Sequence, residues 1–406
     1  MTYVVAFNRD RDFYQVPLAL FEQQMLSFLI TDLYYLNDHP AFGMLPGAAR
    51  LRHRCASGLP SAKVKWNVPA LALQLRNQLV GNSSPDAFDA VDRALSLAAL
   101  KCAQRTRSNL FLYSHYAYDA FTSNRSRDMV KGLFMFHPHT DLIQKILTED
   151  FEDHPECVWS VQYEKDTAGQ NSRTVELREE WRYADFIACA SSFTARSLHH
   201  AGCDPANITV VPYGIDVAEI PFGRNAGGRR RCRFLFVGQG VQRKGLHHLL
   251  KAWSLVKLPN ADLTLILSRA DPGIVKLAGD NVTILAKQTR DDLYQHYNAA
   301  DVFVLPSLVE GFGLVYLEAL AAGCYCIGTE NTGLPDLTSG SQPGNPVIDL
   351  VEVGSVELLA AALERAHDLY QRGALDPAAI RRFAQTKRWD KFRAGISELA
   401  QRNLGA

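Results

Sequence analysis

A chain of 406 residues exceeds the length at which one hydrophobic core usually stops growing, so the sequence predicts two domains. Hydrophobic residues make up 47% and charged residues 21%, proportions that are ordinary for a soluble globular protein. The 43 Lys and Arg residues balance 43 Asp and Glu residues. This balance excludes a chain-wide positive field, and we expect no nucleic-acid partner.

The sequence carries no sign of export or of membrane spanning. No window approaches about 18 uncharged apolar residues, and the opening residues lack a basic segment followed by a long apolar one. The eight cysteines form no CxxC pair, which favours free thiols in a reducing compartment. We therefore expect a cytoplasmic protein, with any membrane contact peripheral and at the inner face of the membrane.

One region departs from the overall charge balance. Residues 50–131 hold 13 Lys and Arg against 5 Asp, a local balance of +8. Such a surface can meet anionic lipid headgroups. It can equally be a solvated face that acids elsewhere in the first domain neutralise, and the sequence leaves both options open.

The first half of the chain alternates short apolar runs with longer amphipathic stretches. Buried strands are predicted at residues 3–7, 28–33, 109–114, 132–136, 157–161, 185–190 and 208–212. Helices are predicted at 69–79 and 86–105, where apolar residues recur three or four apart. Alternation of this kind predicts a parallel sheet covered on both faces.

The glycine- and arginine-rich segment 223–231 predicts an exposed linker, after which the same rhythm restarts. Strands are predicted at 234–237, 263–267, 282–285, 302–305 and 325–328. Helices are predicted at 246–256, from a Thr289 cap through Asn298, and at 314–322. Gly323 follows the last helix, where a left-handed residue is favoured. Two doubly wound domains would place a ligand beyond the carboxyl ends of their strands, in the cleft between them.

Two glutamates eight residues apart, Glu310 and Glu318, lie in an otherwise apolar stretch. Glu310 precedes a helix expected to begin at Gly313 or Leu314, whose free N–H groups form an anion site suited to phosphate. Gly311 and Gly313 allow the backbone to approach a ligand. Glu318 lies one turn deeper on the same face, where a buried carboxylate is costly unless it is bonded. It would hold the hydroxyls of a ribose, or else pair with a neighbouring Lys or Arg.

Two adjacent cations follow the strand at 234–237. Gly238 and Gly240 suggest a dinucleotide fingerprint, but Arg243 occupies the position of its third glycine, so the fingerprint fails. Arg243 and Lys244 are instead expected to supply positive charge beside the phosphate site. The alternative is a pair of solvated surface cations.

Together these motifs resemble a known family, the retaining nucleotide-sugar glycosyltransferases of family 4, which have the GT-B fold. The resemblance rests on Glu310-x7-Glu318 around Gly-Phe-Gly and on residues 236–245, 300–307 and 333–335, with looser matches at 136–139, 184–192 and 211–216. It implies two Rossmann-like domains facing a central cleft. These would be an acceptor domain at 1–218, a donor domain at 219–385, and a C-terminal helix at 386–406 that returns to the first domain.

The resemblance also implies roles for individual residues. Glu310 would contact the donor sugar, Glu318 the ribose, and His137 the sugar near its reacting carbon. Arg243 and Lys244 would neutralise the leaving diphosphate. The remaining donor-binding residues would be Gly240, Gly311, Phe312, Gly313 and Leu314. His137 and His139 could also be packing residues or part of a metal site, although the sequence offers no third ligand nearby.

The expected activity is transfer of a sugar from a UDP- or GDP-sugar to a hydroxyl of a carbohydrate or lipid-linked carbohydrate, with retention. Polysaccharide, lipopolysaccharide or glycolipid biosynthesis would use such a reaction. No cofactor and no obligatory metal are expected. Residues 8–12 depart from the family's glycine loop, and Asp10-x-Asp12 resembles a metal-binding pair but lies in the wrong domain. The alternatives are an epimerase or phosphorylase of the same fold, or a non-catalytic nucleotide-sugar binding module.

Overall fold

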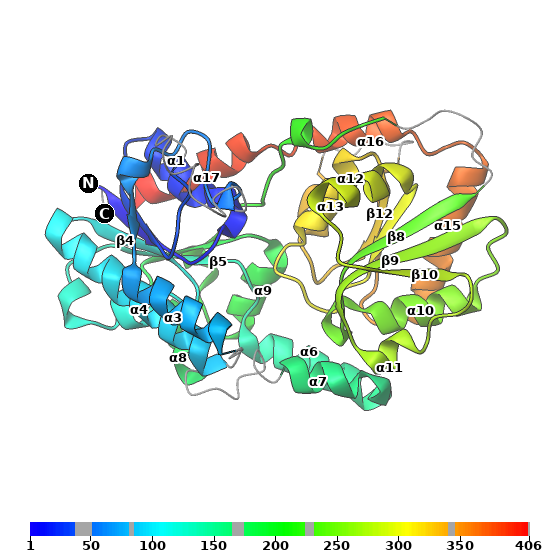
Figure 1. Ribbon diagram of the computed structural model, residues 1–406, viewed down its shortest axis with the longest axis horizontal. Helices are drawn as coiled ribbons and strands as arrows, with labels where there is room; N and C mark the ends of the chain where they lie inside the picture. The colour runs from blue at the N-terminus through cyan, green and yellow to red at the C-terminus, as the bar shows by residue number, and fades with distance from the viewer. Residues whose placement is uncertain (37–50, 81–84, 165–173, 224–230, 340–345, 405–406) are drawn as a thin grey trace.

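The computed structural model describes residues 1–36, 51–80, 85–164, 174–223, 231–339 and 346–404. These residues form two lobes, each built around its own parallel sheet (Figure 1). The prediction of two Rossmann-like domains is confirmed. Most of the linker predicted at 223–231 lies outside the described residues.

The first domain contains a seven-stranded sheet in the order β3-β2-β1-β4-β5-β6-β7. Every neighbouring pair is parallel, and the register sets Val4 beside Phe28 on one side and beside Leu110 on the other. The strands are β1 (Tyr3–Ala6), β2 (Leu26–Thr31), β3 (Val64–Trp66), β4 (Asn109–Tyr113), β5 (Lys131–Met135), β6 (Phe186–Cys189) and β7 (Ile208–Val210).

Helices connect these strands and cover the sheet. They are α1 (Gln15–Glu22), α3 (Val68–Leu79), α4 (Pro85–Thr106), α5 (Tyr118–Phe121), α6 (Thr140–Asp153), α7 (Val158–Glu164), α8 (Thr174–Glu179) and α9 (Ser192–His200). The strands β1 and β4 are buried along their whole length, as expected of a sheet covered on both faces.

The second domain repeats the design with six parallel strands in the order β10-β9-β8-β11-β12-β13. The strands are β8 (Cys232–Gly240), β9 (Ala261–Ala270), β10 (Val282–Ala286), β11 (Val302–Leu305), β12 (Tyr325–Thr329) and β13 (Ile348–Val351). The helices are α10 (Leu246–Leu255), α11 (Pro272–Val275), α12 (Arg290–Ala299), α13 (Leu314–Ala321), α14 (Leu334–Leu337), α15 (Val356–Gln371) and α16 (Pro377–Ala384). Thr289 caps α12 through its side chain, and Gly323 follows α13 with φ +82°, both as predicted.

The last helix, α17 (Trp389–Arg402), leaves the second domain and packs beside α1 in the first (Figure 1). The Tyr3 hydroxyl donates to the Ala400 carbonyl at 2.9 Å, and the Ser397 hydroxyl donates to the Ala19 carbonyl at 3.0 Å. The C-terminal helix therefore returns to the first domain, which confirms that part of the prediction.

The strand predicted at 157–161 is wrong. Cys157 ends the 3₁₀ turn η5 (Pro155–Cys157), and the following residues begin α7. Cys157 and Ser160 are buried while Val158 is exposed, so burial follows a helical spacing of three rather than the alternation of a strand. The segments α6, η5 and α7, residues 140–164, form what we call the helical arm, which extends from the first domain beneath α10 and α11 (Figure 1).

Other features of the structure agree with the composition. All eight cysteines are free, and seven of them are buried. In the described part of the chain, no helix combines the length and apolar character that crossing a bilayer requires.

Candidate active site

The strand order of the second domain fixes where its site can lie. Neighbouring strands β8 and β11 are followed by connections that run to opposite sides of the sheet, so the crevice between their carboxyl ends is the topological switch point. The turn η9 (Gln242–Lys244) follows β8, and residues 306–313 follow β11. The sequence-predicted cations and Glu310 are therefore carried to the same crevice.

Arg243, Lys244 and Glu310 meet there. The Glu310 carboxylate forms an ion pair with the Lys244 ammonium and lies 3.4 Å from the Arg243 guanidinium. The three side chains are only 12% to 20% exposed. The backbone holds them in place, because Leu308 N–H donates to the Arg243 carbonyl at 2.9 Å and Glu310 N–H donates to the Asn331 carbonyl at 2.9 Å. Two cations with one carboxylate leave a net positive charge beside a helix start.

The helix is α13, and the two glycines that precede it have different roles. Gly313 caps the helix with φ +88°, a left-handed conformation that glycine adopts without a steric penalty. Gly311 packs against the first domain, where an added Cβ would lie 2.0 Å from the Phe136 carbonyl oxygen. The Gly311 carbonyl accepts hydrogen bonds from Ser191 at 2.5 Å and Thr194 at 3.2 Å. The loop before α13 thus joins the two domains at the cleft.

Two of the predicted donor-binding residues have clear packing roles in the structure. Phe312 is buried, its ring lies against Gly333, and its centroid is 5.2 Å from that of Tyr213 in the first domain. Gly240 ends β8 in close contact with Leu246 and Leu267. Their part in donor binding stays a prediction.

Glu318 lies one turn into α13, as predicted. In the described part of the chain, its carboxylate accepts a hydrogen bond from the Tyr297 hydroxyl at 3.1 Å rather than forming an ion pair. Burial raises its pKa, and the Tyr297 hydrogen bond opposes the shift. Together with Leu314 it lines a cavity of about 1040 Å³ between the domains, whose walls also include Arg290, Tyr294, Gly214, Phe13 and Trp389.

His137 follows β5 in the first domain and lies within reach of the charges of Arg243 and Lys244. Desolvation lowers the pKa of His137 well below the ordinary value, and the charges of His115, Arg11, Arg243 and Lys244 lower it further. The imidazole is therefore neutral at neutral pH and can exchange hydrogen bonds with a ligand. His139 instead is buried and caps α6, where Asp141 N–H donates to its ring at 3.3 Å.

Residues 8–14 form a first-domain wall of the cleft that the sequence did not define. The non-glycine residues Arg9, Asp12, Phe13 and Tyr14 all have positive φ. The Tyr113 hydroxyl hydrogen-bonds the two Asp12 carboxylate oxygens at 2.9 and 2.7 Å, and burial raises the pKa of Asp12 to about 7. The sequence did carry a signal for this wall: charged residues of alternating sign follow the first strand, where the family resemblance implies a glycine loop.

The basic region 50–131 is partly neutralised within the first domain. Arg54 pairs with buried Asp32, and Arg93 lies 3.1 Å from Asp119. The Lys65 ammonium lies over the Phe28 ring, 3.5 Å from its centroid. Arg50 lies outside the described residues. Arg54 and Arg93 are thus paired with acids of the first domain, and contact of the region with lipid stays a prediction.

Comparison with known proteins finds a family match within the second domain. Residues 231–368 match the family Glycosyl transferases group 1. D-inositol 3-phosphate glycosyltransferase from Mycolicibacterium vanbaalenii is 32% identical over 209 residues, 42% of this chain and 46% of the relative. The match thus spans about half the length of that protein. These likenesses support a relationship with the group 1 glycosyltransferases, and the family match itself lies in the second domain.

Solved structures match over the whole chain. HepE from Anabaena, in complex with UDP, has a TM-score of 0.61 at 14% identity and covers 99% of this chain and 100% of its own. Sucrose-phosphate synthase from Thermosynechococcus elongatus has a TM-score of 0.62 at 16% identity and covers 100% of both chains. At such identity the likeness concerns the fold, and it confirms the predicted GT-B arrangement.

Proposed function

We propose that this protein is a retaining glycosyltransferase of family 4 that moves a sugar from a UDP- or GDP-sugar to a hydroxyl of a carbohydrate or lipid-linked carbohydrate. One observation carries the proposal: Arg243, Lys244 and Glu310 meet at the glycine-opened start of α13. The group 1 match and the HepE complexes with UDP and UDP-glucose agree with a nucleotide-sugar donor.

The charges suit the cleavage of a bond between a sugar and a diphosphate. Negative charge grows on the leaving diphosphate, and the two cations and the free amides of α13 are held ready to stabilise it. In the structure the single Glu310 carboxylate contacts both cations. An arriving diphosphate would replace it as their partner, and the released carboxylate would then turn to the hydroxyls of the sugar.

The remaining residues would position the donor and the acceptor. Glu318 would accept hydrogen bonds from the ribose, and neutral His137 would bond a hydroxyl of the sugar. When acceptor and leaving group lie on the same face of the sugar, the leaving phosphate can take the proton of the acceptor hydroxyl. The reaction then requires neither a dedicated base nor a metal ion.

A thermal-shift panel of UDP-, GDP- and ADP-sugars would identify the donor, because a ligand that binds only the folded state raises the melting temperature. Arg243→Ala should abolish this shift. Glu310→Ala should lower transfer by about 10²–10³-fold while nucleoside diphosphate binding persists or tightens, since the internal competitor is gone. Arg372→Ala, on the exposed end of α15, is the matched control. Undiminished transfer by both site variants would reject this site.

A further inference from the structure

The helical arm contacts the second domain through a polar interface beside the crevice that holds Arg243 and Lys244. Ser160 N–H and hydroxyl each lie 2.7 Å from the Asp271 carboxylate, and Gln242 N–H donates to the Ser160 hydroxyl at 3.0 Å. An added Cβ at Gly273 would lie 2.1 Å from the Glu156 carbonyl oxygen, so the two surfaces are in close contact. The proposed transfer reaction uses none of these contacts.

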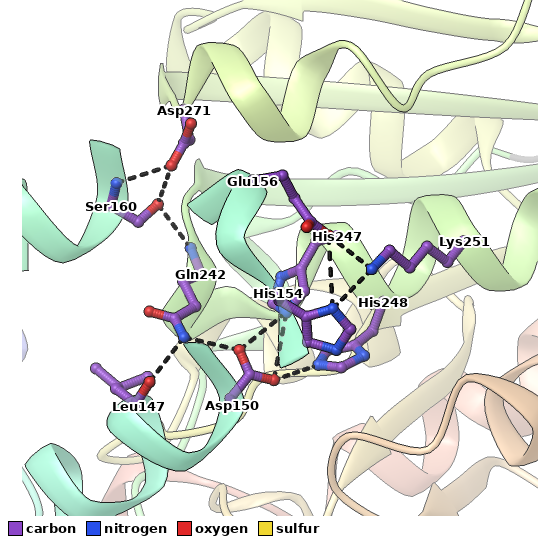
Figure 2. A network of polar contacts seen from close by, with 10 residues as sticks. All are labelled: Leu147, Asp150, His154, Glu156, Ser160, Gln242, His247, His248, Lys251 and Asp271. Atoms are coloured by element: carbon purple, nitrogen blue, oxygen red, sulfur yellow. Dashed lines mark hydrogen bonds and ion pairs between the residues drawn. The ribbon is translucent and has the colours of Figure 1, made fainter. Parts of the chain in front are cut away.

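Four side chains with metal-ligating atoms converge within this interface (Figure 2). Asp150 and His154 come from the arm, and His247 and His248 come from the first turn of α10. The Asp150 carboxylate lies 3.1 Å from His247 Nε2 and 2.6 Å from His248 Nε2. One ligating atom from each of the four residues lies within 4.8 Å of all the others.

The cluster is buried, which distinguishes it from a chance group of surface histidines. The side chains of Asp150, His247 and His248 are 8%, 0% and 3% exposed. The ring centroids of His247 and His248 are 4.0 Å apart, and that of His154 lies 4.9 Å and 4.6 Å from them. Three imidazoles packed around one carboxylate are costly to bury unless a shared partner satisfies them.

The donor set indicates which partner fits. Three imidazole nitrogens and one carboxylate oxygen form the borderline set that Zn²⁺ prefers, and four protein ligands are typical of a closed structural site. A neutral imidazole offers one ring lone pair to a metal ion, and the buried positions of His247 and His248 suit that form. With neutral imidazoles, Asp150, Glu156 and Lys251 sum to one negative charge, which favours a divalent cation.

We propose that Asp150, His154, His247 and His248 bind one divalent transition-metal ion of the zinc type, which fastens the helical arm to α10. The Glu156 carboxylate lies 3.5 Å from His154 Nδ1 and would accept a hydrogen bond from that N–H, as second carboxylates do for metal-bound histidines. The ion lies outside the cleft and takes no part in sugar transfer. Its place is next to the cationic pair, because Gln242, which precedes Arg243, donates to Asp150 at 2.7 Å.

Lys251 is the group that has to leave His154 Nδ1 before this nitrogen can donate to Glu156. Its ammonium lies 2.6 Å from His154 Nδ1 and 2.6 Å from Glu156. Its side chain is 31% exposed and can therefore turn toward solvent as the ion enters. Lys251→Met should consequently tighten metal binding, because it removes a positive charge from beside the cation.

The test uses the full chain without a histidine tag, stripped with a chelator and titrated with Zn²⁺ or Co²⁺ by calorimetry and visible absorption. We expect one equivalent per chain with a Kd below about 1 μM, four-coordinate Co²⁺ bands, and a melting temperature that rises with the metal. A stripped wild-type chain that binds no metal would overturn the proposal and leave a polar docking contact only. Neither result depends on sugar transfer.

Variants locate the ion. His248→Ala and Asp150→Asn should each weaken binding by at least about 100-fold, since even outer partners of a metal contribute 10–100-fold. The matched control is His199→Ala with His200→Ala, an adjacent histidine pair exposed on α9. If that control removes the binding, or if His248→Ala binds as tightly as wild type, the ion lies elsewhere and the proposal fails. Circular dichroism checks that each variant is folded.

Discussion

Each domain presents the carboxyl edge of its parallel sheet to the cleft, and the two edges differ in the residues that form them. In the second domain, the switch point between β8 and β11 carries Arg243, Lys244 and Glu310 next to glycines. In the first domain, β1 and β4 also meet at a point where the strand order reverses. The loop 8–14 that follows β1 there has no glycine and holds four residues at positive φ.

The difference follows from what each edge is proposed to bind. The diphosphate is the same chemical group in every nucleoside-diphosphate sugar, so backbone amides and fixed cations suit it, and this solution leaves a recognisable sequence pattern. An acceptor varies from one enzyme to the next, so side chains have to define its site. Left-handed non-glycine residues each cost about 1 kcal/mol or more, and surrounding contacts such as the Tyr113 bond to Asp12 hold the loop in place.

The largest effect is expected from Gly311→Ala, which would test whether the two edges depend on each other. The added Cβ would lie 2.0 Å from the Phe136 carbonyl oxygen and 3.4 Å from the His137 Cα atom. We expect unfolding in denaturant to show a loss of about 2–3 kcal/mol and nucleotide affinity to fall at least about tenfold, because the loop must move. Gly223→Ala, with no atom within 4 Å of the new Cβ, should change stability by less than about 0.5 kcal/mol. Similar behaviour of the two variants would mean that the edges are independent.

A smaller effect is expected from Glu318→Gln, which tests the proposed ribose contact. An amide accepts weaker hydrogen bonds than a carboxylate, so the Kd for the nucleoside diphosphate should rise about tenfold, close to 1.4 kcal/mol. The ligand-free variant should be at least as stable as wild type, because a buried charge is removed. Tyr297→Phe removes the internal hydrogen bond but keeps the carboxylate, and its Kd should stay within about twofold. Equal binding by Glu318→Gln and wild type would exclude the ribose contact.

The sequence predicts the site of the second domain better than the loop of the first domain. The site of the second domain is local in sequence: a strand, a glycine-opened helix start and Glu310 follow one another, so short patterns predict their geometry. The strand at 302–305 and the Thr289 cap were predicted correctly for this reason. Contacts between distant residues, such as the Ser191 bond to the Gly311 carbonyl, leave no local pattern. The same holds for the meeting of Asp150 and His154 with His247 and His248.

The helical arm shows how a local pattern can also mislead. Residues 157–161 form a short apolar run, which periodicity alone cannot assign to a strand or a helix. Docking against the second domain decided the outcome, because Cys157 and Ser160 are buried at helical spacing and Ser160 bonds Asp271. The strands β3 and β13 were missed because they are short and only partly buried.

The smallest effect is expected in the first-domain edge, where Asp12→Asn should change the pH dependence of stability. Burial raises the pKa of Asp12 from 3.8 to about 7, so the folded protein holds a proton that the unfolded chain releases near pH 4. The contribution to the free energy of unfolding is therefore complete below about pH 4, declines as the pH rises toward 7, and is constant above that. The variant lacks this term, so the melting temperature of wild type relative to Asp12→Asn should fall between pH 4 and 7.

Tyr113→Phe gives that measurement an internal check. The Tyr113 hydrogen bond lowers the pKa of Asp12, so its loss should move the end of the decline to higher pH. Parallel melting profiles for wild type and Asp12→Asn would show instead that the carboxylate is as well solvated in the folded protein as in the unfolded chain. The left-handed loop would then hold Asp12 toward water, and the acceptor edge would differ from the donor edge in backbone conformation but not in the burial of its charge.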